Sequence, residues 1–263
     1  MAKRKGKLPS TGLDDERSEW FRGHFDAAQE VVDLCHSSGF ELEGKRIADI
    51  GCGDGIIDLG LVIKGKPAEL IGYDLNEVDI AKLLAEATTE EGITELPPEL
   101  SFIKSQPERI PADDGSFDLV VTWSAFEHVA DPEALLRDIR RVMKPDGVLF
   151  LQLWPFYNSE HGSHLWQWFP DGFAQFTHSD AEITARIEAD ESTDPSWGAM
   201  MLREYRALNR ITLDDLGAAI ERAGLRVSRL KLITNDCIVP ASTAGTQLSA
   251  LAIGGVQLLA VKA

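Results

Sequence analysis

The chain has 263 residues, 44% of them hydrophobic, and a formal net charge of −17 at pH 7. The negative charge repels phosphate backbones, so nucleic acid is excluded as an expected partner. No run approaches the roughly 18 apolar residues of a membrane span, and the basic residues Lys3, Arg4, Lys5 and Lys7 precede no apolar signal core, so we expect a cytoplasmic protein without membrane contact.

The spacing of apolar residues predicts the secondary structure of the first half in chain order. An amphipathic helix is expected over residues 19–36. Short apolar runs then alternate with helical patterns, which is typical of βαβ units and a mostly parallel sheet. Strands are predicted at 46–50, 69–74, 101–104, 117–122 and 147–153, and helices at 56–63, 77–87 and 132–143.

The pattern changes after residue 153. Residues 154–209 are rich in aromatic and turn residues, without a clean period, and are too many for an ordinary loop, so we interpret them as an inserted lid. A helix at 213–223 and strands from 224 onward and over 254–261 would complete a sheet of seven strands. The expected parts are a tail and cover helix (1–40), a cofactor-binding core (41–153), an acceptor insertion (154–209) and the completion of the sheet (210–263).

A glycine turn follows the first predicted strand. The segment reads Asp49-x-Gly51-x-Gly53-x-Gly55, and the second strand ends at Asp74. Glycines allow a tight turn and a close approach of the backbone to a ligand. A carboxylate at the second strand end can accept hydrogen bonds from both hydroxyls of a ribose. The pair predicts adenosine binding.

The spacing of this turn separates two classes of cofactor. Nicotinamide enzymes use Gly-x-Gly-x-x-Gly, whereas here the third glycine comes one residue earlier and Asp49 precedes the first. An acid suits the ammonium and sulfonium of S-adenosylmethionine and would repel a pyrophosphate. The turn therefore favours S-adenosylmethionine. The weaker alternatives are a nicotinamide oxidoreductase and a turn that only packs the strand on the helix.

Three further segments accompany the turn. The chain carries Pro-Ala-Asp-Asp-Gly-Ser-Phe-Asp at 111–118, Phe-Glu-His-Val at 126–129, and Leu-x-x-Ile-x-Arg-Val-Met-Lys-Pro-x-Gly at 136–147. With these motifs the region 45–153 resembles the class I S-adenosylmethionine-dependent methyltransferases, in their small-molecule, type 11-like branch. The resemblance implies an α/β fold, with a doubly wound, mostly parallel, seven-stranded Rossmann-like sheet.

The resemblance also implies positions for the cofactor. The methionine end would lie at Asp49, Gly51, Gly53 and Gly55, the ribose at Asp74, and the adenosine beside Leu75 and Asn76. Relatives carry Asp-Ala where this chain has Ser105-Gln106, so the adenine contact is carried over to these two residues. Trp123 and Ser124 would line the cofactor and acceptor pocket, with a packing role for Trp123 as the alternative.

Methyl transfer is an in-line displacement, and most of its rate comes from positioning the acceptor. A hydroxyl acceptor must also lose a proton, for which histidine is the commonest base. His128, His161 and His164 are the catalytic candidates, and a structural hydrogen bond is the alternative for His128. No metal ligands are assigned, although Glu160 and Asp171 could bind a divalent ion if they are not simply solvated.

Aromatic residues are the candidates for binding the acceptor. They are Trp154, Tyr157 and Trp166 in the insertion, and Trp20 and His24 in the N-terminal helix. Aromatic faces with interspersed polar groups suit a sugar ring or a planar aromatic acceptor. The alternative is a small separate core under the insertion.

These features together predict O-methylation of a small hydroxylated metabolite, with a sugar or glycoside ahead of a phenol or polyketide. A carbon or nitrogen methyltransferase is the nearest alternative, and a protein that binds the cofactor without catalysis is the alternative of a different class. The expected partner is a small-molecule acceptor, and a homodimer is compatible with the sequence.

Overall fold

The computed structural model describes residues 12–107 and 109–263, so the basic residues Lys3 to Lys7 lie outside the described part. The chain forms two compact units, one ending at Lys104 and the other beginning at Ser105. The seven strands have the order β3-β2-β1-β4-β5-β7-β6, which confirms the predicted seven-stranded α/β sheet. None of the described helices is long and apolar enough to cross a membrane.

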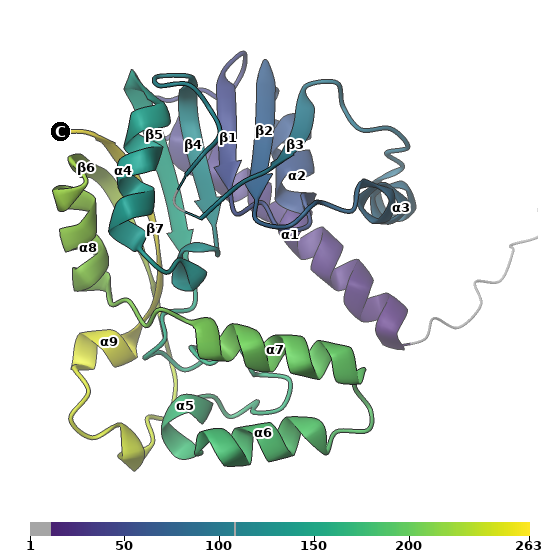
Figure 1. Ribbon diagram of the computed structural model, residues 1–263, viewed down its shortest axis with the longest axis vertical. Helices are drawn as coiled ribbons and strands as arrows, with labels where there is room; N and C mark the ends of the chain where they lie inside the picture. Colours follow the sequence, from purple (N-terminus) through teal and green to yellow (C-terminus); the bar gives the residue numbers. More distant parts are fainter. Residues whose placement is uncertain (1–11, 108) are drawn as a thin grey trace, which may run out of the picture. The chain divides into compact units, whose positions relative to one another are not determined.

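The first unit alternates helices and strands (Figure 1). Its parallel strands lie in the order β3-β2-β1, with Asp49 opposite Gly72 and Ile50 opposite Tyr73. The ends of β1 and β2 therefore lie next to each other. The elements are α1 (Gly12–His36), β1 (Arg46–Ile50), α2 (Ile56–Gly65), β2 (Glu69–Asp74), α3 (Ile80–Glu91) and β3 (Leu100–Lys104).

The helices of this unit differ from the expected bounds, α2 only by continuing to Gly65 instead of ending at residue 63. Helix α1 begins before residue 19 and packs on α2, where a Cβ on Gly60 would lie 2.6 Å from the carbonyl oxygen of Phe25. Helix α3 begins at Ile80 because the Asp79 side chain caps it, accepting a hydrogen bond of 3.0 Å from the Lys82 backbone. Residues 77–79 are consequently loop.

The second unit has its strands in the order β4-β5-β7-β6, with β7 antiparallel to both neighbours. Helices α4 and α8 lie side by side on it (Figure 1). Strand β5 begins at Met143, which already pairs with Phe117, so α4 ends one residue earlier than expected. The elements are β4 (Phe117–Trp123), η1 (Phe126–His128), α4 (Pro132–Val142), β5 (Met143–Leu153), α5 (Ala174–Thr177), α6 (Asp180–Glu188), α7 (Pro195–Ala207), α8 (Leu213–Arg222), β6 (Leu225–Thr234), η2 (Ala241–Thr243), α9 (Leu248–Ala252) and β7 (Ile253–Lys262).

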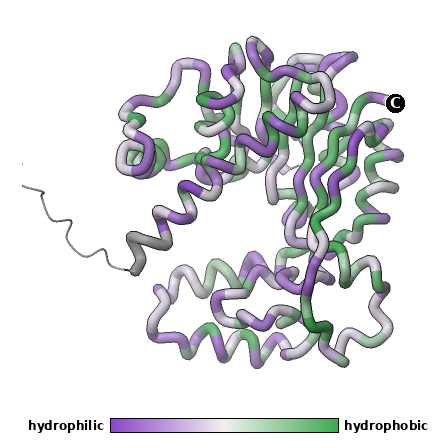
Figure 2. The backbone as a smooth tube through the Cα atoms, turned by 180° about the vertical axis from the view of Figure 1, so that it is seen from behind, coloured by the Kyte–Doolittle hydropathy of each residue, from purple (hydrophilic) through white to green (hydrophobic). Residues whose placement is uncertain are grey.

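Residues 154–209, called the insertion below, contain helices despite the lack of a clean period in their sequence. Ser179 and Glu182 form a capping box at the start of α6, and Asp194 caps α7 with Pro195 in its first turn. Figure 2 shows hydrophilic and hydrophobic residues alternating along these helices, as expected of helices with one buried face.

The insertion has its own hydrophobic cluster, so the alternative of a small separate core holds for Trp168 and Phe169. The buried members are Leu165, Trp168, Phe169, Ala174, Ile183, Ile187, Leu202, Tyr205 and Leu208.

Candidate functional site

The glycine turn lies between β1 and α2 in the first unit. Gly51 N donates a hydrogen bond of 2.7 Å to the Tyr73 carbonyl, which ties the turn to the end of β2. A Cβ on Gly55 would lie 2.6 Å from the Phe102 ring, so packing requires glycine there. Gly53 is exposed at φ +58°, and a Cβ on it would meet no atom within 4 Å. The backbone at Gly53 is therefore open to a ligand.

Two carboxylates adjoin this turn. The Asp74 carboxylate accepts hydrogen bonds from Gly53 N (3.0 Å) and Asn76 N (2.8 Å), which fix its orientation. Asp49 is 2% exposed, and its Oδ1 has no hydrogen-bond partner among the described residues. Burial, and then the charge of Asp74, raise the pKa of Asp49 to about 7. A cationic group that reached Asp49 would satisfy a buried oxygen that is costly to leave unpaired.

A third carboxyl, that of Asp58, lies near the turn. Asp58, in the first turn of α2, is fully buried, and neither of its oxygens has a partner among the described residues. Burial and the nearby Asp49 raise its pKa. Asp58 was not among the predicted site residues, although an acid among the apolar residues that begin α2 was a usable signal. The turn and its surroundings are suited to a ligand with an ammonium and a sulfonium.

The remaining candidates of the first unit lie near the turn, and all of them except the half-buried His24 are exposed. Leu75 is 52% exposed, and Asn76 is exposed directly after β2. Trp20 is 50% exposed, and its Nε1 donates a hydrogen bond of 2.9 Å to Asp54 in the glycine turn. The His24 ring lies 4.0 Å from the Trp20 ring. Trp20, a predicted acceptor residue, is thus brought to the candidate cofactor turn.

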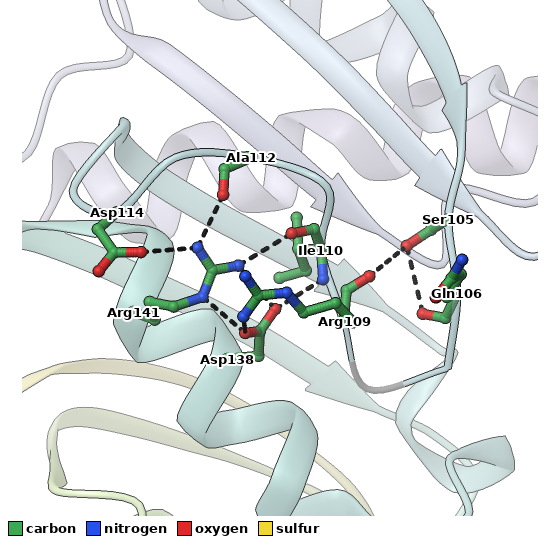
Figure 3. A network of polar contacts seen from close by, with 8 residues as sticks. All are labelled: Ser105, Gln106, Arg109, Ile110, Ala112, Asp114, Asp138 and Arg141. Carbon is green, nitrogen blue, oxygen red and sulfur yellow. Dashed lines mark hydrogen bonds and ion pairs between the residues drawn. The ribbon is translucent and has the colours of Figure 1, made fainter.

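Ser105 and Gln106 begin a loop that hydrogen bonds fix onto α4 (Figure 3). Ser105 Oγ donates to the Arg109 carbonyl at 3.1 Å, and Asp138 accepts from Arg109 and Arg141 at 3.0 and 2.7 Å. The Ser105 hydroxyl is thus engaged within the loop, whereas Gln106 is exposed. Of the two, Gln106 is the better placed to contact a ligand.

Trp123 is the last residue of β4, and Ser124 follows it. The Trp123 ring lies parallel to the Phe150 ring at 6.0 Å, in agreement with the packing alternative. Ser124 has φ +44°, a left-handed conformation that costs energy in a residue other than glycine, and its N–H donates to the Gln152 carbonyl at 3.1 Å. Residues in such strained conformations concentrate at functional sites.

The segment that follows β4 in the chain, together with the insertion, brings two of the three candidate histidines close to an acid that was not predicted as a site residue. The rings of His128 and His164 lie edge to face, 5.3 Å apart. Glu127 is 4% exposed, and the potential ligand atoms of these three residues lie within 4.8 Å of one another. Both Glu127 oxygens, His128 Nδ1 and His164 Nε2 have no hydrogen-bond partner among the described residues. We call Glu127, His128 and His164 the His–Glu cluster.

Burial determines the charge states in this cluster. It raises the pKa of Glu127 to about 8 and lowers the pKa of His128, despite the nearby Glu204. Burial, with a contribution from His128, lowers the pKa of His164 to about 3. Both imidazoles are therefore neutral at pH 7 in the free protein. Because its pKa is so low, His164 is a poor proton acceptor and a better hydrogen-bond acceptor or ligand.

Asn209, at the end of the insertion, holds the segment that carries the cluster. Its Nδ2 donates to the carbonyls of Phe126 (2.8 Å) and Val129 (2.9 Å), and its N–H donates to the Glu127 carbonyl (2.9 Å). The role of Asn209 was not predictable from the sequence, because its partners are about 80 residues away and no local pattern marks such contacts.

The predicted aromatic residues of the insertion fall into two groups. Trp154, His161 and Trp166 have ring centroids 5.9 to 6.3 Å apart, and Trp166 lies 6.1 Å from His164, so these rings adjoin the His–Glu cluster. Tyr157 instead packs against the separate core of the insertion and lies under the guanidinium of Arg210. The structure does not bring Tyr157 to the other candidates.

The known proteins that this chain resembles are methyltransferases. A family model described as a methyltransferase domain matches residues 25–230, most of the chain. Ubiquinone biosynthesis O-methyltransferases from Cereibacter sphaeroides and Xanthomonas oryzae are 35% and 31% identical to it over 115 and 116 residues, which are 43% and 44% of this chain and 42% and 45% of theirs. The chain thus matches less than half the length of these relatives.

Solved structures share the fold. The YcgJ protein of Bacillus subtilis has a TM-score of 0.54 and 15% identity, covering 90% of this chain and 98% of that one. A methyltransferase in complex with the Trm112 activator of Haloferax volcanii has a TM-score of 0.51 and 19% identity, covering 94% and 97%. Such distant likeness shows the fold only. The family model decides the class: the chain belongs to the S-adenosylmethionine-dependent methyltransferases.

Proposed function

We propose that this methyltransferase transfers the methyl group to a hydroxyl of a small ring-containing metabolite. The single observation that carries the proposal is the His–Glu cluster. It combines a buried carboxyl with two neutral imidazoles whose facing atoms have no hydrogen-bond partner among the described residues. Groups of this kind bind a hydroxyl, and of the two imidazoles His128 is the one left to accept its proton. The relatives named as O-methyltransferases support the same acceptor atom.

The proposal assigns the cofactor to the glycine turn. S-adenosylmethionine supplies a methyl group on a sulfonium that leaves as a neutral thioether. Asp49 would accept hydrogen bonds from its ammonium, and Asp74 would accept from the ribose hydroxyls. Gly53 allows close approach of the backbone, and Leu75 and Asn76 follow Asp74 where an adenosine would lie. The orphaned Oδ1 of Asp49 supports this assignment.

The acceptor is proposed to bind beyond the end of β4. In open α/β sheets ligands bind outside the carboxyl ends of the strands, and the His–Glu cluster follows β4 directly. Trp154, His161 and Trp166 offer ring faces beside it. Ring faces bind the apolar side of a sugar and the plane of a phenol alike. The relatives' names favour O-methylation and give no support to a carbohydrate in particular.

An acceptor screen tests the proposal. The purified protein is incubated with S-adenosylmethionine and paired acceptors, namely phenols, catechols, sugars and glycosides, each with an analogue whose hydroxyl is already methylated. Release of S-adenosylhomocysteine and the mass and NMR spectrum of the product are measured. We expect product only from the free hydroxyls. Transfer exclusively to carbon or nitrogen acceptors would contradict the proposal.

Two variants locate the acceptor site. His164→Asn is expected to lower turnover while the affinity for S-adenosylmethionine stays near that of the wild type, because His164 lies in the acceptor cluster. His36→Asn, on an exposed histidine at the end of α1, is the matched control. Equal turnover in the two variants would show that the acceptor does not bind at the His–Glu cluster.

A further inference from the structure

Glu127, His128 and His164 come from two segments of the second unit and face one another. Glu127 and His128 are neighbours in η1, and His164 lies in the insertion at φ +60°, a left-handed conformation unusual for a residue other than glycine. Their potential ligand atoms lie within 4.8 Å of one another. We propose that the His–Glu cluster binds a divalent transition-metal ion, of the class of zinc.

The absence of partners within the cluster points to a ligand. Glu127 is only 4% exposed, and neither of its carboxylate oxygens accepts a hydrogen bond from a described residue. His128 Nδ1, which lies 3.5 Å from Glu204 Oε2, and His164 Nε2 also have no hydrogen-bond partner there. A native structure rarely leaves so many buried polar atoms unsatisfied in one place. A single cation would satisfy one atom from each residue.

The donor set selects the kind of ion. Two imidazole nitrogens and one carboxylate oxygen form the ligand set of catalytic zinc sites and of the two-histidine, one-carboxylate iron sites. Magnesium and calcium prefer oxygen ligands. Zinc bonds of about 2.0–2.2 Å place the donors of a tetrahedron roughly 3.4 Å apart. The cluster would close by about an ångström on binding, within the reach of side-chain rotation.

The surroundings of the cluster resemble those of a metal site. His164 Nε2 has no hydrogen-bond partner among the described residues. Asn209 fixes the backbone on both sides of Glu127. Glu204 Oε2 lies 3.5 Å from His128 Nδ1 and adds a further negative charge.

Three protein ligands leave a coordination position open. Zinc lowers the pKa of a bound oxygen acid, as it does for water. An acceptor hydroxyl in the open position would therefore lose its proton to solvent more readily. This role rests on the proposed O-methylation, whereas metal binding itself does not.

Metal binding is tested directly on the full-length protein. The protein is treated with a chelator, dialysed, and titrated with Zn²⁺ by calorimetry and with Co²⁺ by visible spectroscopy. We expect one site, a Co²⁺ d–d spectrum, and a rise in the unfolding temperature with Zn²⁺. Glu127→Gln and His164→Asn should each weaken Zn²⁺ binding by more than about tenfold. Glu188→Gln and His36→Asn, outside the cluster, should leave it unchanged.

The outcomes separate this inference from the proposed function. No Zn²⁺ or Co²⁺ binding by the wild type, or equal binding by folded Glu127→Gln and His164→Asn, would overturn the metal site. Far-UV circular dichroism establishes that the variants are folded, and His128→Gln replaces either variant if it is not. Metal binding without transfer to any hydroxyl would contradict the proposed function alone. O-methylation by metal-free protein that binds no metal would contradict the metal site alone.

Discussion

Trp20 Nε1 donates a hydrogen bond of 2.9 Å to the carboxylate of Asp54, which links the N-terminal helix to the glycine turn. Half of the Trp20 surface is exposed, and its ring lies 4.0 Å from the His24 ring, tilted by 33°. A bond between exposed groups contributes little to stability by itself. Its position beside the turn suggests that it holds α1 as a cover for the cofactor.

Replacing Trp20 should therefore weaken cofactor binding more than folding. For Trp20→Ala we expect the dissociation constant for S-adenosylmethionine to rise about tenfold, because an aromatic face and its hydrogen bond are lost together. Calorimetry measures the constant, and thermal unfolding should change little. Trp197→Ala removes another exposed tryptophan, 42% exposed on α7, and serves as the control. A loss of affinity of the same size in both variants would refute the cover.

Asp49 should make cofactor affinity depend on pH. Its pKa is raised to about 7, first by burial and then by Asp74, so the carboxylate that attracts an ammonium is mostly protonated at pH 6 and mostly ionised at pH 8. We expect affinity for S-adenosylmethionine to rise by about tenfold over this interval. Calorimetry at several pH values checks it.

Asp49→Asn is the control for this pH dependence. The amine of the cofactor titrates in both experiments, so only the part of the slope that the variant lacks belongs to Asp49. The variant should bind weakly at every pH. An identical slope in the two proteins would show that another group is responsible.

Asn209 should matter for turnover without touching the cofactor turn. Asn209→Ala removes two hydrogen bonds, to the carbonyls of Phe126 and Val129, that fix the segment with Glu127 and His128. A displacement of about an ångström at reacting groups can cost up to about 100-fold in rate. We expect a fall in kcat with unchanged cofactor affinity. Asn158→Ala, at the other asparagine of the insertion, is the comparison, and equal kcat values would show that Asn209 does not position the cluster.

Asp138 should contribute mainly to stability. Burial raises its pKa, but hydrogen bonds from Arg141 and Ile110 outweigh this, and the pKa is lowered overall. Its stabilising contribution is therefore present at neutral pH and lost as the pH falls through the acid range. Asp138→Asn should reduce the free energy of unfolding by about 2 kcal/mol at pH 7. Urea unfolding measures it, and the exposed Asp146→Asn should change it by less than about 0.5 kcal/mol.

Much of the sheet was predictable from the sequence because strands such as β1 and β2 are short apolar runs with local boundaries. Strands β1 and β2 lie where the pattern predicts them. Helices α6 and α7 were not predicted, because the segment that contains them shows no clean hydrophobic period. The Ser179–Glu182 capping box and Asp194-Pro195 nevertheless mark the starts of these helices in the sequence. Cap residues were better evidence there than apolar spacing.

The candidate site was only partly readable. Asp49 and Asp74 follow from a motif within one βαβ unit, because consecutive parallel strands end at the same edge. The approach of His164 to Glu127 was not predictable, since it depends on how a long insertion folds back on β4. The low pKa of His164, about 3, was hidden for the same reason: burial by residues distant in the sequence causes it.

The separate hydrophobic cluster of the insertion has an evolutionary consequence. Its helices α6 and α7 are stabilised largely by residues of the same segment, such as Ile183 and Leu202. Mutations on their outward surfaces, or the exchange of the whole segment, can therefore accumulate without disturbing the glycine turn. Descendants of one such enzyme could acquire new acceptors while inheriting the same methyl donor.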